Sequence, residues 1–159
     1  MALLNIVKEG DPTLRKVCRP VTEITPRILQ LLDDMVETLI DSNGAGLAAP
    51  QVGILRRIAV VDMGDEIVEL INPEIIAAEG QQQELEGCLS VPDVWGITDR
   101  PQKVTVKATN RFGEEFTVTG EDLDARCFCH ELDHLDGIVY TEVMERFLTE
   151  EELMADDED

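Results

Sequence analysis

The only two histidines of the chain stand four residues apart, with a glutamate directly after the first of them. An α-helix turns by about 100° per residue, so His130, Glu131 and His134 share one face of a helix that we predict over about 122–136. Two imidazoles one turn apart can hold one metal ion, and a carboxylate beside them can act on water at that ion. The spacing therefore predicts a metal site and favours hydrolytic chemistry.

A catalytic metal site needs a third protein ligand and one position left open for water. Cys127 lies on the histidine face of the predicted helix but, at about 1.5 Å rise per residue, it starts roughly 10 Å from His134. Cys129 points to the polar side of that helix. Cys18 lies in an ordinary mixed segment, where we expect a buried structural thiol. Cys88 follows a glycine that lets the backbone approach a partner closely, which makes Cys88 the best candidate.

The predicted helix over about 122–136 is apolar over much of its circumference and stops at Gly137. Such a helix is expected to lie at the centre of the fold, with its metal-binding face lining a pocket. Leu123 and Cys127 share the histidine face. The polar side is predicted to consist of Asp122, Arg126, Cys129, Asp133 and Asp136.

Other elements follow from hydrophobic patterning. An amphipathic helix is predicted over 24–42, where apolar residues recur at helical spacing and Pro26 suits the first turn. Four short β-rich runs follow, at 58–62, 67–71, 104–108 and 115–119, and the last two alternate as the strands of a hairpin do. Helices and short strands without βαβ alternation predict an α+β fold.

Length and charge restrict the classes of partner. The 159 residues fit one catalytic domain over 1–148, followed by an acidic tail over 149–159 that opens with a capping-box pattern. A net charge of −21 repels phosphate backbones and anionic membranes, so neither nucleic acid nor membrane is an expected direct partner. No apolar run approaches the roughly 18 residues of a membrane helix, and the start makes a poor signal peptide. We therefore expect a cytoplasmic protein whose four cysteines stay thiols or metal ligands.

Three segments together resemble the signature motifs of the peptide deformylases. They are Gly44-Ala45-Gly46-Leu47-Ala48-Ala49-Pro50-Gln51, Glu86-Gly87-Cys88-Leu89-Ser90 and His130-Glu131-Leu132-Asp133-His134. All three occur in the family's order and at family-like separations, and the resemblance extends from the Ile6 region to about Phe147.

The resemblance implies a fold and a set of roles. Short antiparallel β-sheets would pack around a central metal-binding helix. One divalent metal ion, Fe²⁺ by resemblance although zinc, nickel or cobalt can substitute, would be held by Cys88, His130 and His134, with water as fourth ligand. Glu131 would act as general base and then as general acid. The side-chain amide of Gln51 and the backbone N–H of Leu89 would stabilise the oxyanion.

The resemblance also implies how a substrate is bound. Backbone groups around Ala45 and Gly46, with Gly87 opposite, would pair with an extended N-formylmethionyl nascent peptide. The alternative for this segment is a helix-ending turn and a packed strand. Four further residues match family positions near the substrate: Leu123, Arg126 and Cys127 in the methionine pocket, and Arg100 beside it. Ordinary helix packing is the alternative for the first three, and a surface ion pair for Arg100.

Two departures and two rival functions accompany the resemblance. Cys129 replaces a glutamine that many family members carry, and we expect it to face away from the metal. The acidic tail excludes ribosome contact through a basic C-terminal helix, and a monomer is expected. A zincin-like metallopeptidase would share the histidines but leaves the segment around Cys88 unexplained. A closed structural zinc site would use Cys127, Cys129, His130 and a distant cysteine. The helical spacing described above argues against it, because neither Cys127 nor Cys129 is well placed to share an ion with the histidines.

Overall fold

The computed structural model describes residues 3–142 and 144–147, and the predicted acidic tail lies outside them. Its α-helices are α1 (Pro26–Ser42) and α2 (Leu123–Leu135), and three short 3-10 helices are η1 (Pro12–Arg15), η2 (Ala49–Val52) and η3 (Tyr140–Glu142). The strands are β1 (Gly46–Ala48), β2 (Ile58–Asp62), β3 (Ile67–Glu79), β4 (Gln82–Cys88), β5 (Val91–Arg100), β6 (Lys103–Thr109), β7 (Glu115–Glu121) and β8 (Met144–Phe147).

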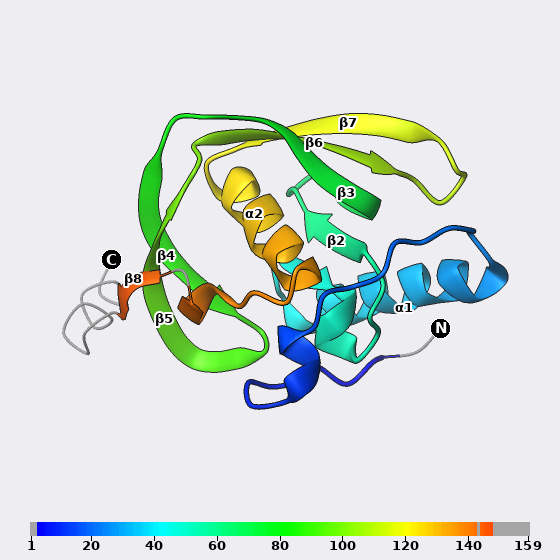
Figure 1. The fold of residues 1–159 in the computed structure, drawn as a ribbon, viewed down its shortest axis with the longest axis horizontal. Helices are drawn as coiled ribbons and strands as arrows, with labels where there is room; N and C mark the ends of the chain where they lie inside the picture. Colours follow the sequence, from blue (N-terminus) through cyan, green and yellow to red (C-terminus); the bar gives the residue numbers. More distant parts are fainter. Residues whose placement is uncertain (1–2, 143, 148–159) are drawn as a thin grey trace.

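The strands form two antiparallel sheets. The larger has the order β1-β2-β3-β6-β7, and the smaller has the order β4-β5-β8. One edge of the larger sheet is β1, and one edge of the smaller sheet is β4. Figure 1 shows α2 between the strands of the two sheets. The predicted α+β fold, with antiparallel sheets around a central helix, is confirmed.

Helix α1 forms where the spacing predicted it. Thr25 caps its start, since its hydroxyl accepts a hydrogen bond from the Ile28 N–H, and Pro26 occupies the first turn. Asn43 ends it in a left-handed conformation, at a φ of 56°. The buried face of α1 packs on the larger sheet through Leu32, Met35 and Leu39 against Leu47, Ile58 and Val60.

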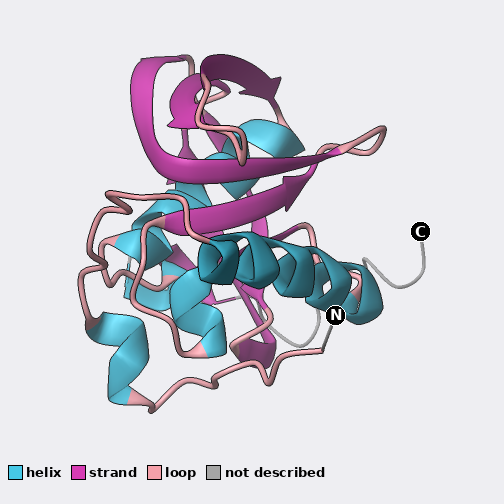
Figure 2. Ribbon diagram, turned by 90° about the vertical axis from the view of Figure 1, so that its right-hand side faces the viewer, coloured by secondary structure: helices cyan, strands magenta, loops and turns pink. Residues whose placement is uncertain are grey.

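The two helices cover opposite faces of the larger sheet. Successive side chains of a strand point to opposite faces, and Val60 packs with α1 whereas its neighbour Val61 packs with α2. The same alternation separates Leu70, on the α2 side, from Ile71, on the α1 side. Figure 2, turned by 90°, shows α1 running along the outside of the strands. Helix α1 therefore lies on the outside of the larger sheet, whereas α2 lies between the larger and the smaller sheet.

The predicted polar side of α2 is wrong at two positions. Arg126 and Cys129 are only 3% and 6% exposed, although Asp122 and Asp136 do face solvent. The prediction assumed that one side of this helix meets water, but here the smaller sheet covers Arg126, and Cys129 packs in the core between α2 and the larger sheet. Arg126 accordingly contacts Glu86 on β4 and Thr98 on β5.

The predicted hairpin is confirmed as β6 and β7, whose turn closes through the Gly113 N–H on the Asn110 carbonyl. Strands β4 and β5 and the second half of β3 were not predicted. In β4 (Gln82–Cys88) the exposed positions carry glutamine and glutamate, and at the end of β3 six consecutive residues are exposed, so neither segment shows a clear alternation of apolar and polar residues. Within the described residues, no helix has the length and apolar content needed to cross a membrane.

Candidate metal centre

Three donor side chains meet where β4 approaches α2. Cys88 is the last residue of β4, and His130 and His134 are one turn apart on α2. The Cys88 Sγ lies 3.3 Å from the His134 Nε2, which lies 3.2 Å from the His130 Nε2. Nitrogen donors at about 2.0–2.1 Å around a tetrahedral metal are separated by roughly 3.4 Å, so these distances fit a single ion. This is the donor cluster able to hold a metal among the residues that the structure describes.

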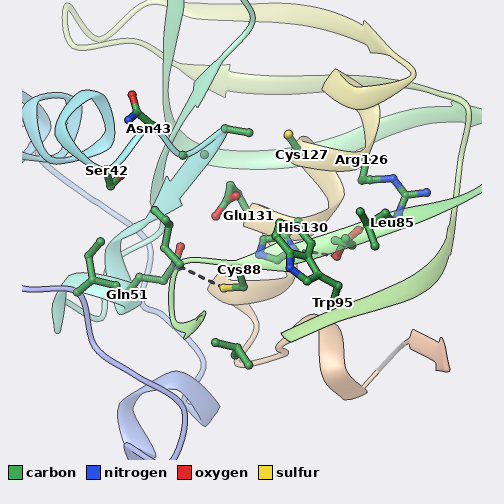
Figure 3. Close-up of a pocket in the computed structure, with 18 of the residues that line it drawn as sticks. Ser42, Asn43, Gln51, Leu85, Cys88, Trp95, Arg126, Cys127, His130 and Glu131 are labelled. Atoms are coloured by element: carbon green, nitrogen blue, oxygen red, sulfur yellow. Dashed lines mark hydrogen bonds and ion pairs between the residues drawn. The ribbon is translucent and has the colours of Figure 1, made fainter. Parts of the chain in front are cut away.

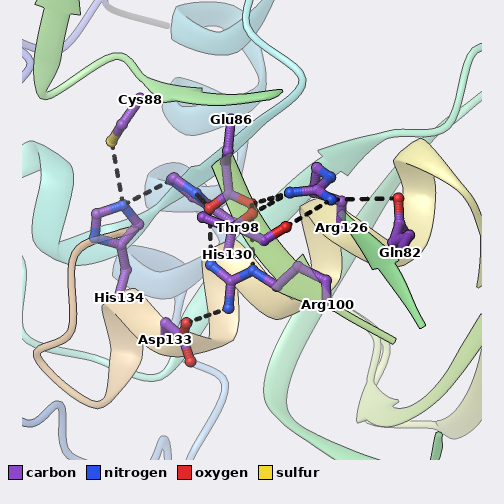
Figure 4. Close-up of polar contacts among 9 residues, drawn as sticks. All are labelled: Gln82, Glu86, Cys88, Thr98, Arg100, Arg126, His130, Asp133 and His134. Carbon is purple, nitrogen blue, oxygen red and sulfur yellow. Dashed lines mark hydrogen bonds and ion pairs between the residues drawn. The ribbon is translucent and has the colours of Figure 1, made fainter. Parts of the chain in front are cut away.

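Glu86 fixes the orientation of the first histidine ring. Its Oε2 lies 2.8 Å from the His130 Nδ1, so the Nε2 is left to face the other two donors (Figure 4). The ring of Tyr140 stacks on His130 at a centroid distance of 5.9 Å. Burial alone would raise the pKa of Glu86, but hydrogen bonds from His130 and Arg100 outweigh it and hold that pKa well below its usual range.

Two arginines hold Glu86 in turn. Arg100, on β5, donates to both Glu86 oxygens at 3.2 and 2.7 Å and to Asp133 on α2 at 2.7 Å. Arg126, on α2, donates to the Glu86 Oε1 at 3.0 Å and to the Thr98 hydroxyl. We call Glu86, Thr98, Arg100, Arg126 and Asp133 the Glu86 network. It joins β4, β5 and α2, the elements that carry the three donors and their support.

Glu131 lies beside the donors as a buried carboxyl group. It is 3% exposed, and its Oε1 has no hydrogen-bond partner in the described part of the chain. Its other oxygen rests against Gly46, where an added Cβ would lie only 2.5 Å from the Oε2. Burial raises the pKa of Glu131 to about 7. A carboxyl group with this pKa can both take up and return a proton near neutrality.

Gln51 is fixed with its amide nitrogen toward the donors. Its Oε1 accepts a hydrogen bond from the Ala48 N–H at 2.9 Å. Its Nε2 therefore points to the Cys88 Sγ, at 3.4 Å (Figure 3), and to the Ser90 hydroxyl, at 3.2 Å. Leu89 follows Cys88 in the turn between β4 and β5, and its side chain packs next to Gly44.

A cavity of about 610 Å³ opens in front of these groups (Figure 3). It lies between the first residues of edge strand β1 and the last residues of edge strand β4, with α2 as its floor. The predicted residues that line it are Ala45, Gly46, Gln51, Gly87, Cys88, Leu89, Leu123, Arg126, Cys127, His130 and Glu131. The structure thus brings together residues that the sequence separates by more than eighty positions.

Two predicted site residues have other surroundings. His134 lies behind His130 and is fully buried. Arg100 does not line the cavity, and it is not a surface ion pair either, because it is 7% exposed within the Glu86 network.

Sequence reasoning missed Trp95 and the role of Glu86. The ring of Trp95 packs on Gly87 at the cavity wall. Its position in an unpredicted strand gave no signal. The sequence did contain a signal for Glu86, because an acidic residue two positions before a candidate metal ligand is a possible hydrogen-bond partner for a ligating histidine.

The remaining cysteines do not join the donors. Cys18 is buried, as predicted, and burial raises its thiol pKa to about 11. Burial also raises the pKa of Cys127 to about 12 and that of Cys129 to about 11. The closed zinc site that would use Cys127 and Cys129 is not formed among the described residues.

The fold and the donor set define a class of protein: a small α+β domain that holds a Cys-His-His set between a central helix and a neighbouring strand. The family model described as polypeptide deformylase matches residues 3–149. Peptide deformylases of Acetivibrio thermocellus and Caldicellulosiruptor bescii are 54% and 53% identical over 153 residues, covering 96% of this chain and 90% and 92% of theirs. The chain belongs to the polypeptide deformylase family.

Solved structures agree with this assignment. The peptide deformylase of Thermotoga maritima has a TM-score of 0.88 at 38% identity, covering 91% of this chain and 99% of that one. A peptide deformylase of Acinetobacter baumannii, bound to Met-Ala-Ser, has a TM-score of 0.84 at 33% identity, covering 90% and 99%. The activity is peptide deformylation, a hydrolysis of formylmethionyl peptides during protein biosynthesis.

Proposed function

We propose that this deformylation is metal-dependent and that Cys88, His130 and His134 hold the ion. The observation that carries the proposal is the convergence of three donor atoms, all within 4.8 Å of one another, beside the buried carboxyl group of Glu131. Each donor projects from a rigid element, β4 or α2, and Cys88 and His130 also line the cavity. A bound divalent ion would lower the pKa of water and polarise the formyl carbonyl group.

Glu131 is the proposed general base. Its carboxylate takes a proton from the attacking water while the water oxygen bonds to the formyl carbon, and the carbonyl π electrons move to the formyl oxygen. The C–N bond then breaks as Glu131 returns the proton to the amine nitrogen. Formic acid and the peptide with a free methionine amino group leave, and the formic acid loses its remaining proton to solvent and becomes formate. The pKa of Glu131, raised to about 7 by burial, suits both transfers.

Gln51 and Leu89 are the proposed oxyanion donors. The Gln51 Nε2 is already directed toward Cys88 by the hydrogen bond that its Oε1 accepts from Ala48. The Leu89 N–H belongs to the peptide unit directly after Cys88. Donors aimed at the developing negative charge before the reaction starts lower the barrier most, because they need no reorganisation.

The proposed substrate lies between two strand edges. Main-chain groups around Ala45 and Gly46 and at Gly87 would pair with an extended peptide. Such main-chain pairing binds peptides of many sequences alike. Leu123 and Cys127 would line the methionine pocket. Arg126 would contribute mainly its aliphatic stem, since its guanidinium is engaged with Glu86 and Thr98. Arg100 would act through the Glu86 network rather than touch the peptide.

The ion is proposed to be Fe²⁺, because the family resemblance implies it, while the donor set also suits zinc, nickel or cobalt. We further propose a catalytic domain over 1–148, a cytoplasmic monomer, and no ribosome contact through a basic C-terminal helix. The net charge of −21 supports the last point.

The test is formate release from N-formyl-Met-Ala-Ser by protein loaded anaerobically with Fe²⁺. We expect activity that tracks the metal content and disappears in Cys88→Ala. A second variant, Glu131→Gln, should keep one ion per chain and lose about 10²–10⁴ in kcat. Full activity in metal-free protein would refute the metal dependence. Loss of the ion in Glu131→Gln would make Glu131 a structural residue.

A further inference from the structure

The N-terminal segment touches both parts of the chain that carry the proposed oxyanion donors. We call residues 6–9 the N-terminal strap; it belongs to the dark blue start of the chain in Figure 1. The Val7 N–H donates to the Gln51 carbonyl at 2.6 Å. Two residues later the Glu9 N–H donates to the Ser90 carbonyl at 2.7 Å. The strap therefore bridges two loops that lie about forty positions apart in the sequence.

These two loops belong to different sheets. Gln51 lies in η2, directly after β1 of the larger sheet, whereas Leu89 and Ser90 form the turn between β4 and β5 of the smaller sheet. A direct link between them is the hydrogen bond from the Gln51 Nε2 to the Ser90 hydroxyl. That bond uses the same amide group that is proposed to meet the oxyanion. An independent backbone link is thus needed to hold the distance between the donors.

Lys8 lies between the two backbone contacts and adds a third. Its Nζ donates to the Leu89 carbonyl at 3.2 Å, and its side chain lines the cavity. The Leu89 carbonyl and the Leu89 N–H flank the same Cα. A contact that holds the carbonyl therefore limits rotation of the residue whose N–H must point at the substrate oxygen.

We propose that the N-terminal strap positions the oxyanion donors and that Lys8 is a positioning residue acting through Leu89. This inference rests on the proposed roles of Gln51 and Leu89. Catalysis by aimed donors depends steeply on distance, and a misplacement of about 1 Å can cost roughly 100-fold in rate. Removal of a lysine that only restrains one donor should therefore reduce the catalytic rate by a smaller factor.

A competing role for Lys8 is to attract a carboxylate of the peptide, because its ammonium group lies at the cavity wall of a strongly acidic protein. The two roles separate kinetically. Positioning an oxyanion donor affects the transition state and lowers kcat, whereas attraction of a carboxylate raises KM for peptides that have one.

The experiment compares Lys8→Met, Lys8→Arg and, as a matched control, Lys16→Met, which removes an exposed lysine away from the cavity. Substrates are N-formyl-Met-Ala-Ser with a free C-terminal carboxylate and the same peptide as its amide. We expect kcat of Lys8→Met to fall about 10-fold on both peptides with KM changed less than about twofold. Lys8→Arg, which keeps a donor, should recover most of kcat, and Lys16→Met should match the parent.

A readout other than activity completes the test. Hydrogen exchange of the Leu89 and Ser90 amides in zinc-loaded protein should be faster in Lys8→Met, with unchanged metal content and Tm. Unchanged kcat and exchange would overturn the proposal, as would a rise in KM confined to the carboxylate peptide. A lower Tm or metal content in Lys8→Met would assign Lys8 to folding and overturn it as well. Failure of the proposed function is distinct, because the parent protein itself would then release no formate.

Discussion

Single residues gain their chemistry here from the groups that surround them. Glu131 is one acidic residue among 34, but its burial on α2, beside Gly46 of β1, raises its pKa to about 7. Gly46 allows that position, since the Glu131 carboxylate occupies the space in which a Cβ would lie. A glycine of the first motif thus makes room for a carboxyl group of the third, quite apart from its proposed main-chain contact with the peptide.

Gly46→Ala should therefore displace the carboxylate of Glu131 while leaving the fold intact. The added Cβ would lie 2.5 Å from the Glu131 Oε2, and a side-chain carboxyl group moves at less cost than backbone. We expect kcat to fall by about 10- to 100-fold, with one metal ion still bound per chain. Steady-state kinetics and metal analysis measure this. Parent-like kcat in Gly46→Ala would contradict the contact.

At the scale of elements, the Glu86 network joins two strands of the smaller sheet to α2. Glu86 accepts hydrogen bonds from Arg100, Arg126 and Thr98 and holds the His130 ring. Removing one partner from such a buried cluster leaves an uncompensated charge, which is strongly destabilising. The network therefore supports the donor geometry and the contact between elements at once.

Glu86→Gln should weaken metal binding by about 10- to 100-fold, as loss of a carboxylate partner of a ligating histidine generally does. Competition between the protein and a chelator for Zn²⁺ gives the affinity. Glu84→Gln is the matched control, because Glu84 lies two residues earlier on β4 and is exposed. Equal affinities in the two variants would mean that Glu86 does not orient His130.

The end of α2 provides a test of stability. Gly137 has a φ of 77°, and an added Cβ would lie 2.7 Å from the Arg15 carbonyl oxygen. Gly113 has a similar φ of 80° but open space around it. Gly113→Ala should lower the free energy of unfolding by about 1 kcal/mol, from strain alone, and Gly137→Ala by about 2–3 kcal/mol. Urea denaturation measures both, and equal losses would rule out the contact with Arg15.

The whole molecule places the proposed ion where separate parts of the chain meet. Cys88 comes from the smaller sheet, whereas the histidines come from the helix that also packs on the larger sheet. A bound ion would link these parts in the folded state only, so it should stabilise that state by mass action. The net charge of −21 has the opposite effect on stability, because repulsion between like charges destabilises the compact folded state.

Removal of the metal should lower Tm by on the order of 10 °C, since free metal at about 1,000 times its Kd contributes roughly 4 kcal/mol. Thermal denaturation with and without chelator measures the shift, and added Zn²⁺ should reverse it. Cys88→Ala, which lacks one donor, should show a much smaller difference. An unchanged Tm after complete metal removal would show that the ion does not join these elements.

The sequence alone determined the features that depend on local spacing. The positions of α1 and α2, the hairpin of β6 and β7 and the shared face of His130, Glu131 and His134 all follow from helical or strand periodicity. Cys88 was identified by excluding the other cysteines and by the motif around it. These features depend on residues close in the chain, where geometry is set by fixed turn angles and rises.

Only the tertiary structure decided which faces are covered. Arg126 is buried because a second sheet packs on the side of α2 that helical periodicity assigns to water, and Cys129 is buried because it lies in the core that α2 forms with the larger sheet. The packing of the smaller sheet on α2 also turns Arg100 from a candidate surface residue into a buried partner of Glu86, and a separate contact of the N-terminal strap places Lys8 beside the Leu89 carbonyl. Such contacts join positions far apart in the chain, and hydrophobic periodicity within one element does not contain them.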